Sequence, residues 1–294
     1  MWRTLFVGRR GLRAGWRLGI FIAVTIAVVL IARWASSGLP AESTSGWTPG
    51  LFVLSEAVSL VAAWIVTAIM CRIERRSFPV YGLPVRGFLG RHFWEGSLWG
   101  LLAVVALVGL IGLCGGLTIS GLARTGGALF TSAALWLLAM LLLGLFEELY
   151  FRGYPLYTLS TGIGFWPASL LLSAAFGALH FFGKPMENAV DGASVSLIAL
   201  FLCLTLRRTG TLWFAVGFHF MFDYAALVLF GAPNTGNGGR SIADHLLGVR
   251  YTGPDWLTGG PRGLEASAMV FVVIALLFAA FHFRHRTARY PLPE

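Results

Sequence analysis

Ionisable side chains are rare inside the apolar stretches of this sequence, and those that occur there gather in three short segments. In order, the segments carry Glu147, Glu148 and Arg152, then Phe176 and His180, then His219 and Asp223. An ionisable group in a nonpolar, membrane-like environment costs several kcal/mol, so it marks a candidate functional site. Carboxylates and imidazoles transfer protons, activate water and bind metal ions, which makes these residues candidates for hydrolytic chemistry.

The spacing within two of the segments predicts side chains that share a helix face. Glu148 and Arg152 stand at i and i+4 with the acid first, an arrangement that supports an ion pair. Glu147 is rotated from that face by about 100° and can point elsewhere. His219 and Asp223 also stand at i and i+4, on one stripe of a later helix.

Counting residues from the turns between helices predicts that these groups meet. From a turn near Ile163, Glu147 lies 16 residues before and His180 lies 17 residues after, so an antiparallel hairpin places them side by side. From the next turn on the same side, His219 and Asp223 lie about 15 and 21 Å along their helix. We therefore expect one polar cluster below the membrane surface, within reach of the side that holds these turns.

A purely structural interpretation remains open, because buried polar pairs also hold helices together in membrane bundles. It explains a single pair better than it explains six polar groups at one level. Glu56, inside an earlier apolar stretch, is interpreted as a cavity-facing or interfacial structural residue. Cys71, Cys114 and Cys203 are interpreted as buried, unreactive thiols.

The elements that must position the cluster are long apolar helices. Of the 294 residues, 57% are hydrophobic and 12% are charged, whereas soluble domains carry about 25% charged residues. We predict an all-α, polytopic membrane bundle of about eight transmembrane helices. Their expected positions are near residues 17–34, 51–71, 96–119, 129–159, 165–183, 193–207, 211–231 and 266–283. The fourth is too long for a simple span, so it must tilt, project or kink near Gly153 and Pro155.

Basic residues predict the orientation, because cytoplasmic loops of membrane proteins hold an excess of arginine and lysine. With eight spans, 16 of the 22 basic residues fall on the side that holds both termini. The other six, which include Lys184, fall on the side of the long loop 232–265. Both termini are therefore predicted in the cytoplasm, and the first helix is predicted to be retained rather than cleaved after Trp34.

Three regions are expected, and two other classes of protein fit poorly. The regions are an N-terminal three-span region at 1–127, a core with the three segments at 128–230, and an outer loop with the last helix at 231–294. The glycine- and asparagine-rich start of the outer loop is interpreted as a flexible connection. The net charge of +9 does not indicate nucleic-acid binding, because the basic residues are scattered between hydrophobic spans. No repeat of the kind found in transporter halves is evident.

The three segments resemble the motifs of the CPBP family, the CAAX-prenyl-protease and bacteriocin-processing intramembrane proteases. The matching positions are Glu147-Glu148-x-x-x-Arg152, Phe176-x-x-x-His180 and His219-x-x-x-Asp223. The resemblance covers about a third of the chain. The last motif of the prenyl-protease branch usually ends in asparagine, whereas this chain has Asp223. An anionic side chain is a poor donor to an oxyanion, so Asp223 is either protonated or orients His219.

The resemblance implies an intramembrane glutamic endopeptidase. Glu147 with His180 would activate water, His219 and Asp223 would stabilise the oxyanion, and the other three motif residues would support the site. No cofactor is favoured. The alternative is a zinc-dependent version with Glu147, His180 and His219 as ligands, because two histidines and a carboxylate form a common zinc shell.

The expected partners are the lipid bilayer and a peptide or protein substrate in or at the membrane, with no nucleic acid. CAAX-like peptides, leader peptides and bacteriocin precursors are the implied substrates. A single lysine among the basic residues hints at a GC-rich bacterium, and hence at a bacterial inner membrane. Two rivals remain: a non-catalytic immunity or scaffolding protein of the same fold, and a proton-coupled transporter, which would be expected to show inverted repeats.

Overall fold

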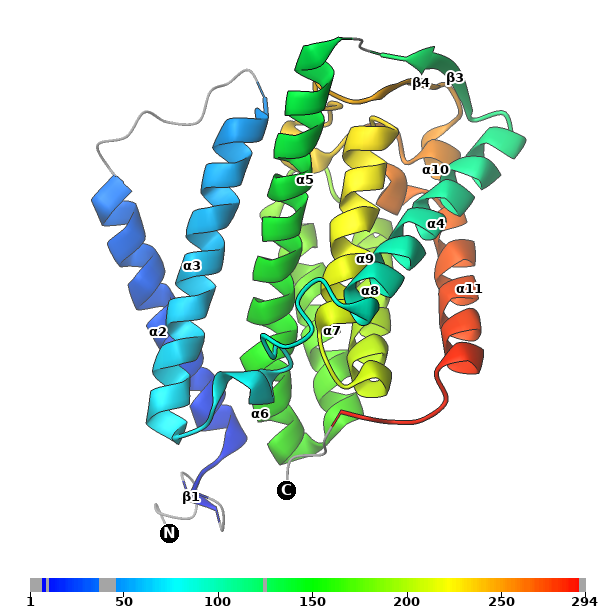
Figure 1. Ribbon diagram of the computed structural model, residues 1–294. Coiled ribbons are helices and arrows are strands. Elements are labelled where there is room, and N and C mark those ends of the chain that lie inside the picture. Colours follow the sequence, from blue (N-terminus) through cyan, green and yellow to red (C-terminus); the bar gives the residue numbers. More distant parts are fainter. Residues whose placement is uncertain (1–6, 9–10, 37–45, 124–125, 291–294) are drawn as a thin grey trace.

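The computed structural model describes residues 7–8, 11–36, 46–123 and 126–290, and most of them are helical (Figure 1). Every predicted apolar segment forms a helix, so the predicted fold class is confirmed. The helices are α2 (Ala14–Ser36), α3 (Pro49–Glu74), α4 (Arg91–Leu113), α5 (Gly127–Glu147) with α6 (Tyr154–Ile163), α7 (Phe165–Gly183), α8 (Ala189–Thr209), α9 (Trp213–Asp223) and α11 (Met269–Arg284).

Length and composition make this a multi-pass membrane protein. In the described part of the chain, six helical segments are long and apolar enough to cross a bilayer: α2, α3, α4, α5 together with α6, α7 and α8. The helices over Trp213–Leu229 and Met269–Arg284 are apolar but shorter. The first of these needs little contact with lipid, because α9 lies inside the bundle and nearly all its side chains are buried.

The connections between helices gather at two ends of the bundle (Figure 1). At one end lie the start of α2, the turns after α3, α6 and α8, and the end of α11. At the other end β3 (Leu117–Leu122) pairs with β4 (Leu247–Tyr251) in an antiparallel ribbon. The third predicted span is shorter than expected, because the helix ends at Leu113 and the chain continues as β3. The remaining elements are β1 (Val7–Gly8), β2 (Gly11–Leu12), α10 (Asp255–Thr258) and several single 3-10 turns.

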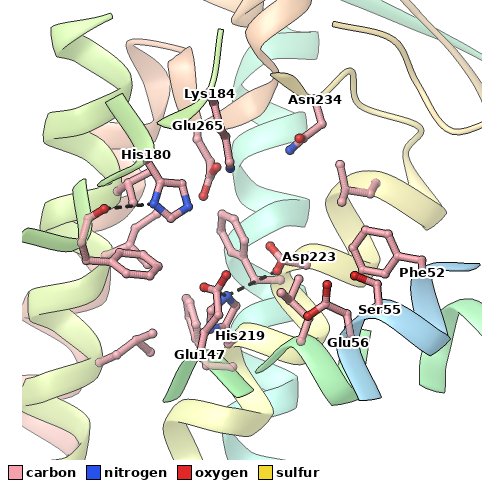
Figure 2. A pocket seen from close by; sticks show the side chains of 18 of the residues that line it. Phe52, Ser55, Glu56, Glu147, His180, Lys184, His219, Asp223, Asn234 and Glu265 are labelled. Atoms are coloured by element: carbon pink, nitrogen blue, oxygen red, sulfur yellow. Dashed lines mark hydrogen bonds and ion pairs between the residues drawn. The ribbon is translucent and has the colours of Figure 1, made fainter. Parts of the chain in front are cut away.

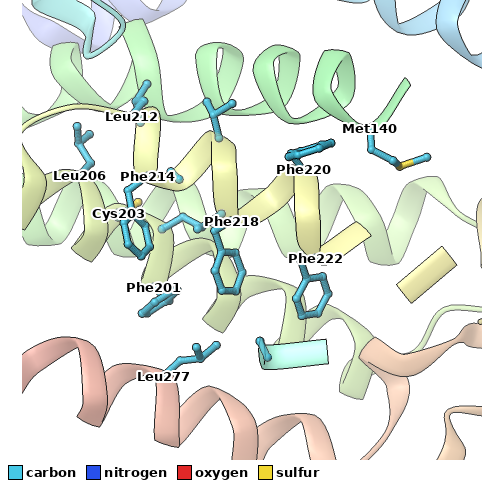
Figure 3. Packing of buried hydrophobic residues seen from close by; sticks show 14 of the residues in the cluster. Met140, Phe201, Cys203, Leu206, Leu212, Phe214, Phe218, Phe220, Phe222 and Leu277 are labelled. Carbon is cyan, nitrogen blue, oxygen red and sulfur yellow. The ribbon is translucent and has the colours of Figure 1, made fainter. Parts of the chain in front are cut away.

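Close backbone contact fixes α9 against α4. A Cβ atom added to Gly96 would collide with the backbone of Phe214, and one added to Gly217 would collide with the backbone of Phe93. Small residues are what allow membrane helices to approach this closely. On its other faces α9 packs phenylalanines against α8 and α11, with Phe218 against Phe201 and Phe214 against Phe281 at ring distances of 5.3 and 5.1 Å (Figure 3).

Two π-helical turns interrupt the helices that carry the acidic motif residues. One spans Glu148–Gly153, between α5 and α6, and the other spans Tyr224–Leu229, directly after α9. Of the three options predicted for the long fourth segment (tilt, projection, or a kink near Gly153 and Pro155), the structure shows a break in the regular helix that ends at Gly153 and begins at Glu148. A π turn holds one residue more than an α turn and re-aims the side chains around it, and such turns are frequent at functional sites.

Two sequence-based expectations need correction. The glycine-rich segment after α9 is not a loose connection, because Thr235 and Asn237 are buried and the Asn237 carboxamide accepts a hydrogen bond from the backbone N–H of Trp47 at 2.8 Å. Of the three thiols expected to be buried, Cys203 is buried and Cys114 is exposed at the end of α4. Four arginines used in the orientation count lie outside the described residues: Arg3, Arg9, Arg10 and Arg124.

Candidate active site

A cavity of about 260 Å³ lies among α3, α5, α7, α8 and α9 (Figure 2). Six of the seven motif residues line it: Glu147, Arg152, Phe176, His180, His219 and Asp223. The seventh, Glu148, is fully buried directly behind this wall. The convergence predicted by counting residues from the turns is therefore confirmed as a shared cavity.

Glu148 and Arg152 form the ion pair that their spacing predicts. The Arg152 Nη1 group donates a hydrogen bond to Glu148 Oε1 at 2.8 Å, and the two residues are 2% and 0% exposed. The Arg152 guanidinium also lies over the Phe176 ring at 4.7 Å. These contacts tie α7 to the π turn after Glu147, so all three residues hold the framework of the site.

His219 lies at the centre of the cluster. Its Nδ1–H donates a hydrogen bond to Glu148 Oε1 at 2.9 Å, which fixes the plane of the imidazole. The opposite nitrogen, Nε2, lies 3.5 Å from Glu147 Oε2 and 3.4 Å from Asp223 Oδ2. Asp223 thus lies beside His219 as its i+4 spacing predicts, and Glu148 has a second role that the spacing did not indicate.

His180 occupies a different wall of the cavity from Glu147. Its Nδ1–H donates a hydrogen bond to the backbone carbonyl of Phe176 at 3.0 Å, which leaves Nε2 as a proton acceptor. Within the described residues no hydrogen bond or ion pair joins His180 to Glu147. The two side chains therefore face the same cavity, as predicted, but they are not in contact and lie on opposite sides of a space (Figure 2).

Residues outside the three motifs complete the lining. Helix α3 contributes Phe52, Ser55 and Glu56, and one carboxylate oxygen of Glu56, Oε2, is buried without a hydrogen-bond partner. The sequence predicts a cavity-facing or interfacial structural role for Glu56, and the residue faces the cavity. The sequence alone marks Glu56 as a candidate, because an isolated carboxylate inside an apolar span is energetically costly and therefore usually has a function.

Connecting segments contribute Trp47, Lys184, Asn234 and Glu265, and the remaining lining is apolar side chains of the surrounding helices. Lys184 Nζ lies 3.7 Å from Glu187 Oε1, which also accepts a hydrogen bond from the hydroxyl of Thr235. Burial and, to a lesser degree, the nearby Asp223 carboxylate raise the pKa of Glu265 to about 7. Sequence spacing could not reveal these residues, because loops have no periodicity that places a side chain.

The cavity reaches the protein surface at the end that carries β3 and β4. Helix α3 begins at that end, two residues after Trp47 (Figure 1). Lys184 directly follows α7, and its side chain is 31% exposed. Tyr81 and Tyr154 do not line the cavity; they are fully buried, with ring centroids 5.2 Å apart. The lining residues from connecting segments therefore lie away from the turns used for counting, and reach from the side of those turns stays a prediction.

The site does not assemble a three-residue metal shell. Glu147, His180 and His219, the zinc ligands of the alternative mechanism, all line the cavity. Across the ranges that the structure describes, no three histidine, cysteine, aspartate or glutamate side chains are grouped closely enough to hold one metal ion.

Comparison with known proteins gives one family. No curated protein matches the chain. Residues 129–225, about a third of the chain, match the family described as type II CAAX prenyl endopeptidase Rce1-like. The matched range begins in α5 and ends just after Asp223, so it contains all three motifs. The match supports an intramembrane CAAX-type protease in general, and it confirms the resemblance of this segment to the CPBP family of membrane proteases.

Proposed function

We propose that this protein is an endopeptidase that hydrolyses peptide bonds of membrane-associated substrates within the cavity. The observation that carries the proposal is the convergence of Glu147, His180, His219 and Asp223 on one cavity inside an apolar bundle. Buried carboxylates and imidazoles without a structural need are typical of acid–base catalysis. A polar cluster that only joined helices would be expected to fill its space rather than line a cavity of about 260 Å³.

Peptide hydrolysis needs a base for water, a donor for the oxyanion and an acid for the leaving amine. We assign the first role to Glu147 with His180, because both face the cavity from different walls and His180 Nε2 is free to accept a hydrogen bond from water. As the water oxygen bonds to the carbonyl carbon, its proton passes to Glu147. The same proton then passes to the departing amine nitrogen as the C–N bond breaks.

The oxyanion would be stabilised by the Nε2 side of His219. The Glu148 hydrogen bond to Nδ1 turns Nε2 towards the cavity. In this role the ring is the imidazolium, with both nitrogens protonated, so that Nε2–H donates to the oxyanion while Nδ1–H donates to Glu148. Asp223 lies 3.4 Å from Nε2, and a carboxylate there orients the imidazole rather than donating to the oxyanion itself. Of the two roles that the sequence left open for Asp223, the orienting role is the one we propose.

The proposed substrates are peptide segments in or at the membrane, of the CAAX-like, leader-peptide or bacteriocin-precursor kind, in a bacterial inner membrane. Both termini are proposed to lie in the cytoplasm, as the arginine distribution predicts. With that orientation the cavity mouth at Lys184 faces the outer side. Ser55 on α3 is exposed and also lines the cavity, so a membrane-embedded segment can approach from the flank of α3.

The test is cleavage of a panel of fluorogenic membrane peptides by the purified protein, with and without a strong zinc chelator. The proposal expects cleavage by the wild type that survives chelation and is lost in both Glu147→Ala and His180→Ala. Loss on chelation and recovery with zinc would replace the glutamate mechanism with the metal-dependent one. A wild type that cleaves nothing across a broad panel would favour a non-catalytic protein of the same fold.

A further inference from the structure

A second polar pocket, distinct from the catalytic cavity, lies at the end of the bundle that holds the start of α2 and the end of α11. It has a volume of about 180 Å³ and is lined by Arg91, His92, Glu95, Arg284, His285 and Arg289. Three guanidinium groups thus surround a single carboxylate, and the pocket is positively charged even with both imidazoles neutral. It shares no residue with the catalytic cavity.

Glu95 cannot balance this charge alone. Its carboxylate Oε1 lies 3.2 Å from His285 Nε2 and 3.8 Å from Arg284 Nε, and its Oε2 lies 3.8 Å from His92 Nδ1. Among the residues that the structure describes, neither Arg91 nor Arg289 is paired with a carboxylate. Guanidinium groups held together without counter-charges favour a bound anion, and their forked donors fit the oxygens of a phosphate group.

The pocket is built rather than formed by chance contact of mobile side chains. Arg289 lies on a strap, residues 285–290, that follows α11 and crosses the end of α8. The backbone N–H groups of Arg289 and Tyr290 donate to the carbonyl of Arg207 at 2.8 and 3.1 Å, and Arg207 Nη1 donates to the carbonyl of Tyr290 at 2.7 Å. Tyr290 is itself buried. The strap therefore holds Arg289 opposite the first turn of α4.

The surroundings favour a lipid as the source of the phosphate. Trp94 and Leu98, which are 57% and 54% exposed, follow Arg91 at i+3 and i+7 on α4, so an apolar stripe runs from the pocket along the helix. Phe283, 67% exposed, adjoins Arg284 on α11. A tryptophan beside basic residues at the end of a spanning helix is typical of the interface between lipid headgroups and acyl chains.

We propose that this pocket binds the phosphate group of an anionic membrane lipid, with an acyl chain along the Trp94–Leu98 stripe. Clustered arginines at a membrane surface attract anionic lipids, and basic pockets between helices bind their headgroups. The strap is part of the site, so lipid binding secures the end of α11 against α4 and α8. The site is independent of the proposed hydrolysis, and it can be tested without any peptide substrate.

The test is native mass spectrometry of the purified protein with phosphatidylglycerol, phosphatidylcholine or inorganic phosphate. We expect preferential binding of phosphatidylglycerol, weakened about fivefold by Arg289→Ala and by Arg91→Ala, the factor that corresponds to about 1 kcal/mol per basic residue at a membrane surface. Arg286→Ala is the matched control, because Arg286 is on the same strap but does not line the pocket, and it should bind as the wild type does.

Three results would overturn the proposal: equal binding of the two lipids by the wild type, equal weakening by Arg286→Ala and Arg289→Ala, or binding of inorganic phosphate without any preference for the anionic lipid. The two arginine variants should retain the wild-type unfolding temperature in phosphatidylcholine, because both side chains are exposed.

Discussion

At the scale of single residues, the site is organised around His219 and the buried acid behind it. Glu148 Oε1 accepts from both Arg152 and His219, so one carboxylate oxygen links the π turn Glu148–Gly153 to α9. The Glu148–Arg152 pair could be predicted from spacing within one helix. The contact between Glu148 and His219 could not, because it depends on how the π turn after Glu147 meets α9.

Removing the Glu148 carboxylate is expected to destabilise the protein. Glu148→Ala leaves the Arg152 guanidinium buried without its partner, and breaking a buried ion pair in this way costs about 3–5 kcal/mol. Thermal unfolding in detergent would measure the loss. The double variant Glu148→Leu with Arg152→Met removes both charges and should recover part of that loss. An unfolding temperature of Glu148→Ala equal to that of the wild type would show that the pair does not hold this region together.

Glu265 is expected to make stability depend on pH. Its pKa is raised to about 7 in the folded protein, mainly by burial, so the folded state holds a proton that the unfolded state releases from about pH 4.5 upwards. Stability should therefore fall as pH rises from about 4.5 to about 7, by up to about 3 kcal/mol. Charges on Asp223, Lys184, Glu187 and His219 also act on the Glu265 carboxyl, and each of them changes its pKa less than burial does.

The measurement compares unfolding temperatures of the wild type and Glu265→Gln at pH 5 and pH 8. Glu265→Gln cannot titrate, so the advantage of the variant over the wild type should grow between the two pH values. A constant difference would mean that Glu265 does not titrate in this range.

At the scale of elements, glycines at the contact between α4 and α9 determine how closely the two helices pack, and so where α9 places His219. Gly217, two residues before His219, touches the backbone of α4, and a Cβ there would lie too close to Phe93. Gly217→Val is therefore expected to destabilise the protein by about 3 kcal/mol, at the upper end of the range for overpacked cores. Gly109→Val on α4 is the control, because a Cβ at Gly109 meets no atom within 4 Å. Similar unfolding temperatures for both variants would contradict this account.

Hydrophobic patterning predicted the helices well because a helix needs about twenty mostly apolar residues to cross a bilayer, and six helical segments of the described chain are long and apolar enough. The same patterning extended the third predicted helix to residue 119, although α4 ends at Leu113. Strand β3 follows closely and is also apolar, and hydrophobicity alone does not distinguish its residues from a continuing helix. The π turns at Glu148 and Tyr224 could not be placed from the sequence, since a π turn differs from an α turn in hydrogen bonding rather than in composition.

At the scale of the whole molecule, the sequence motifs do not show on which side of the membrane the cavity opens. The motif residues could be predicted as a cluster because helix spacing fixes their depth. The wall formed by α3 and the rim at Trp47, Lys184, Asn234 and Glu265 required the folded chain. These residues lie outside the matched range except for Lys184, so the family match does not account for them.

Thiol labelling in intact cells would test the proposed orientation. In a background without native cysteines, Lys184→Cys at the cavity mouth should react with a membrane-impermeant reagent added from outside. Arg86→Cys, exposed at the opposite end of the bundle, should react only after the membrane is opened. Labelling of Arg86→Cys alone in intact cells would reverse the proposed orientation and place the cavity mouth on the cytoplasmic side.

The central claim, that Glu147 is the base of a peptidase, is tested most directly by steady-state cleavage of one membrane peptide by Glu147→Gln and Glu56→Gln. Both substitutions remove a carboxylate from the same cavity with almost no change in shape. We predict that Glu147→Gln lowers kcat by at least about a hundredfold, the lower range for loss of a general base. Glu56→Gln should act mainly on KM and leave kcat within about tenfold of the wild type. Equal loss of kcat in the two variants, or an active Glu147→Gln, would contradict the account.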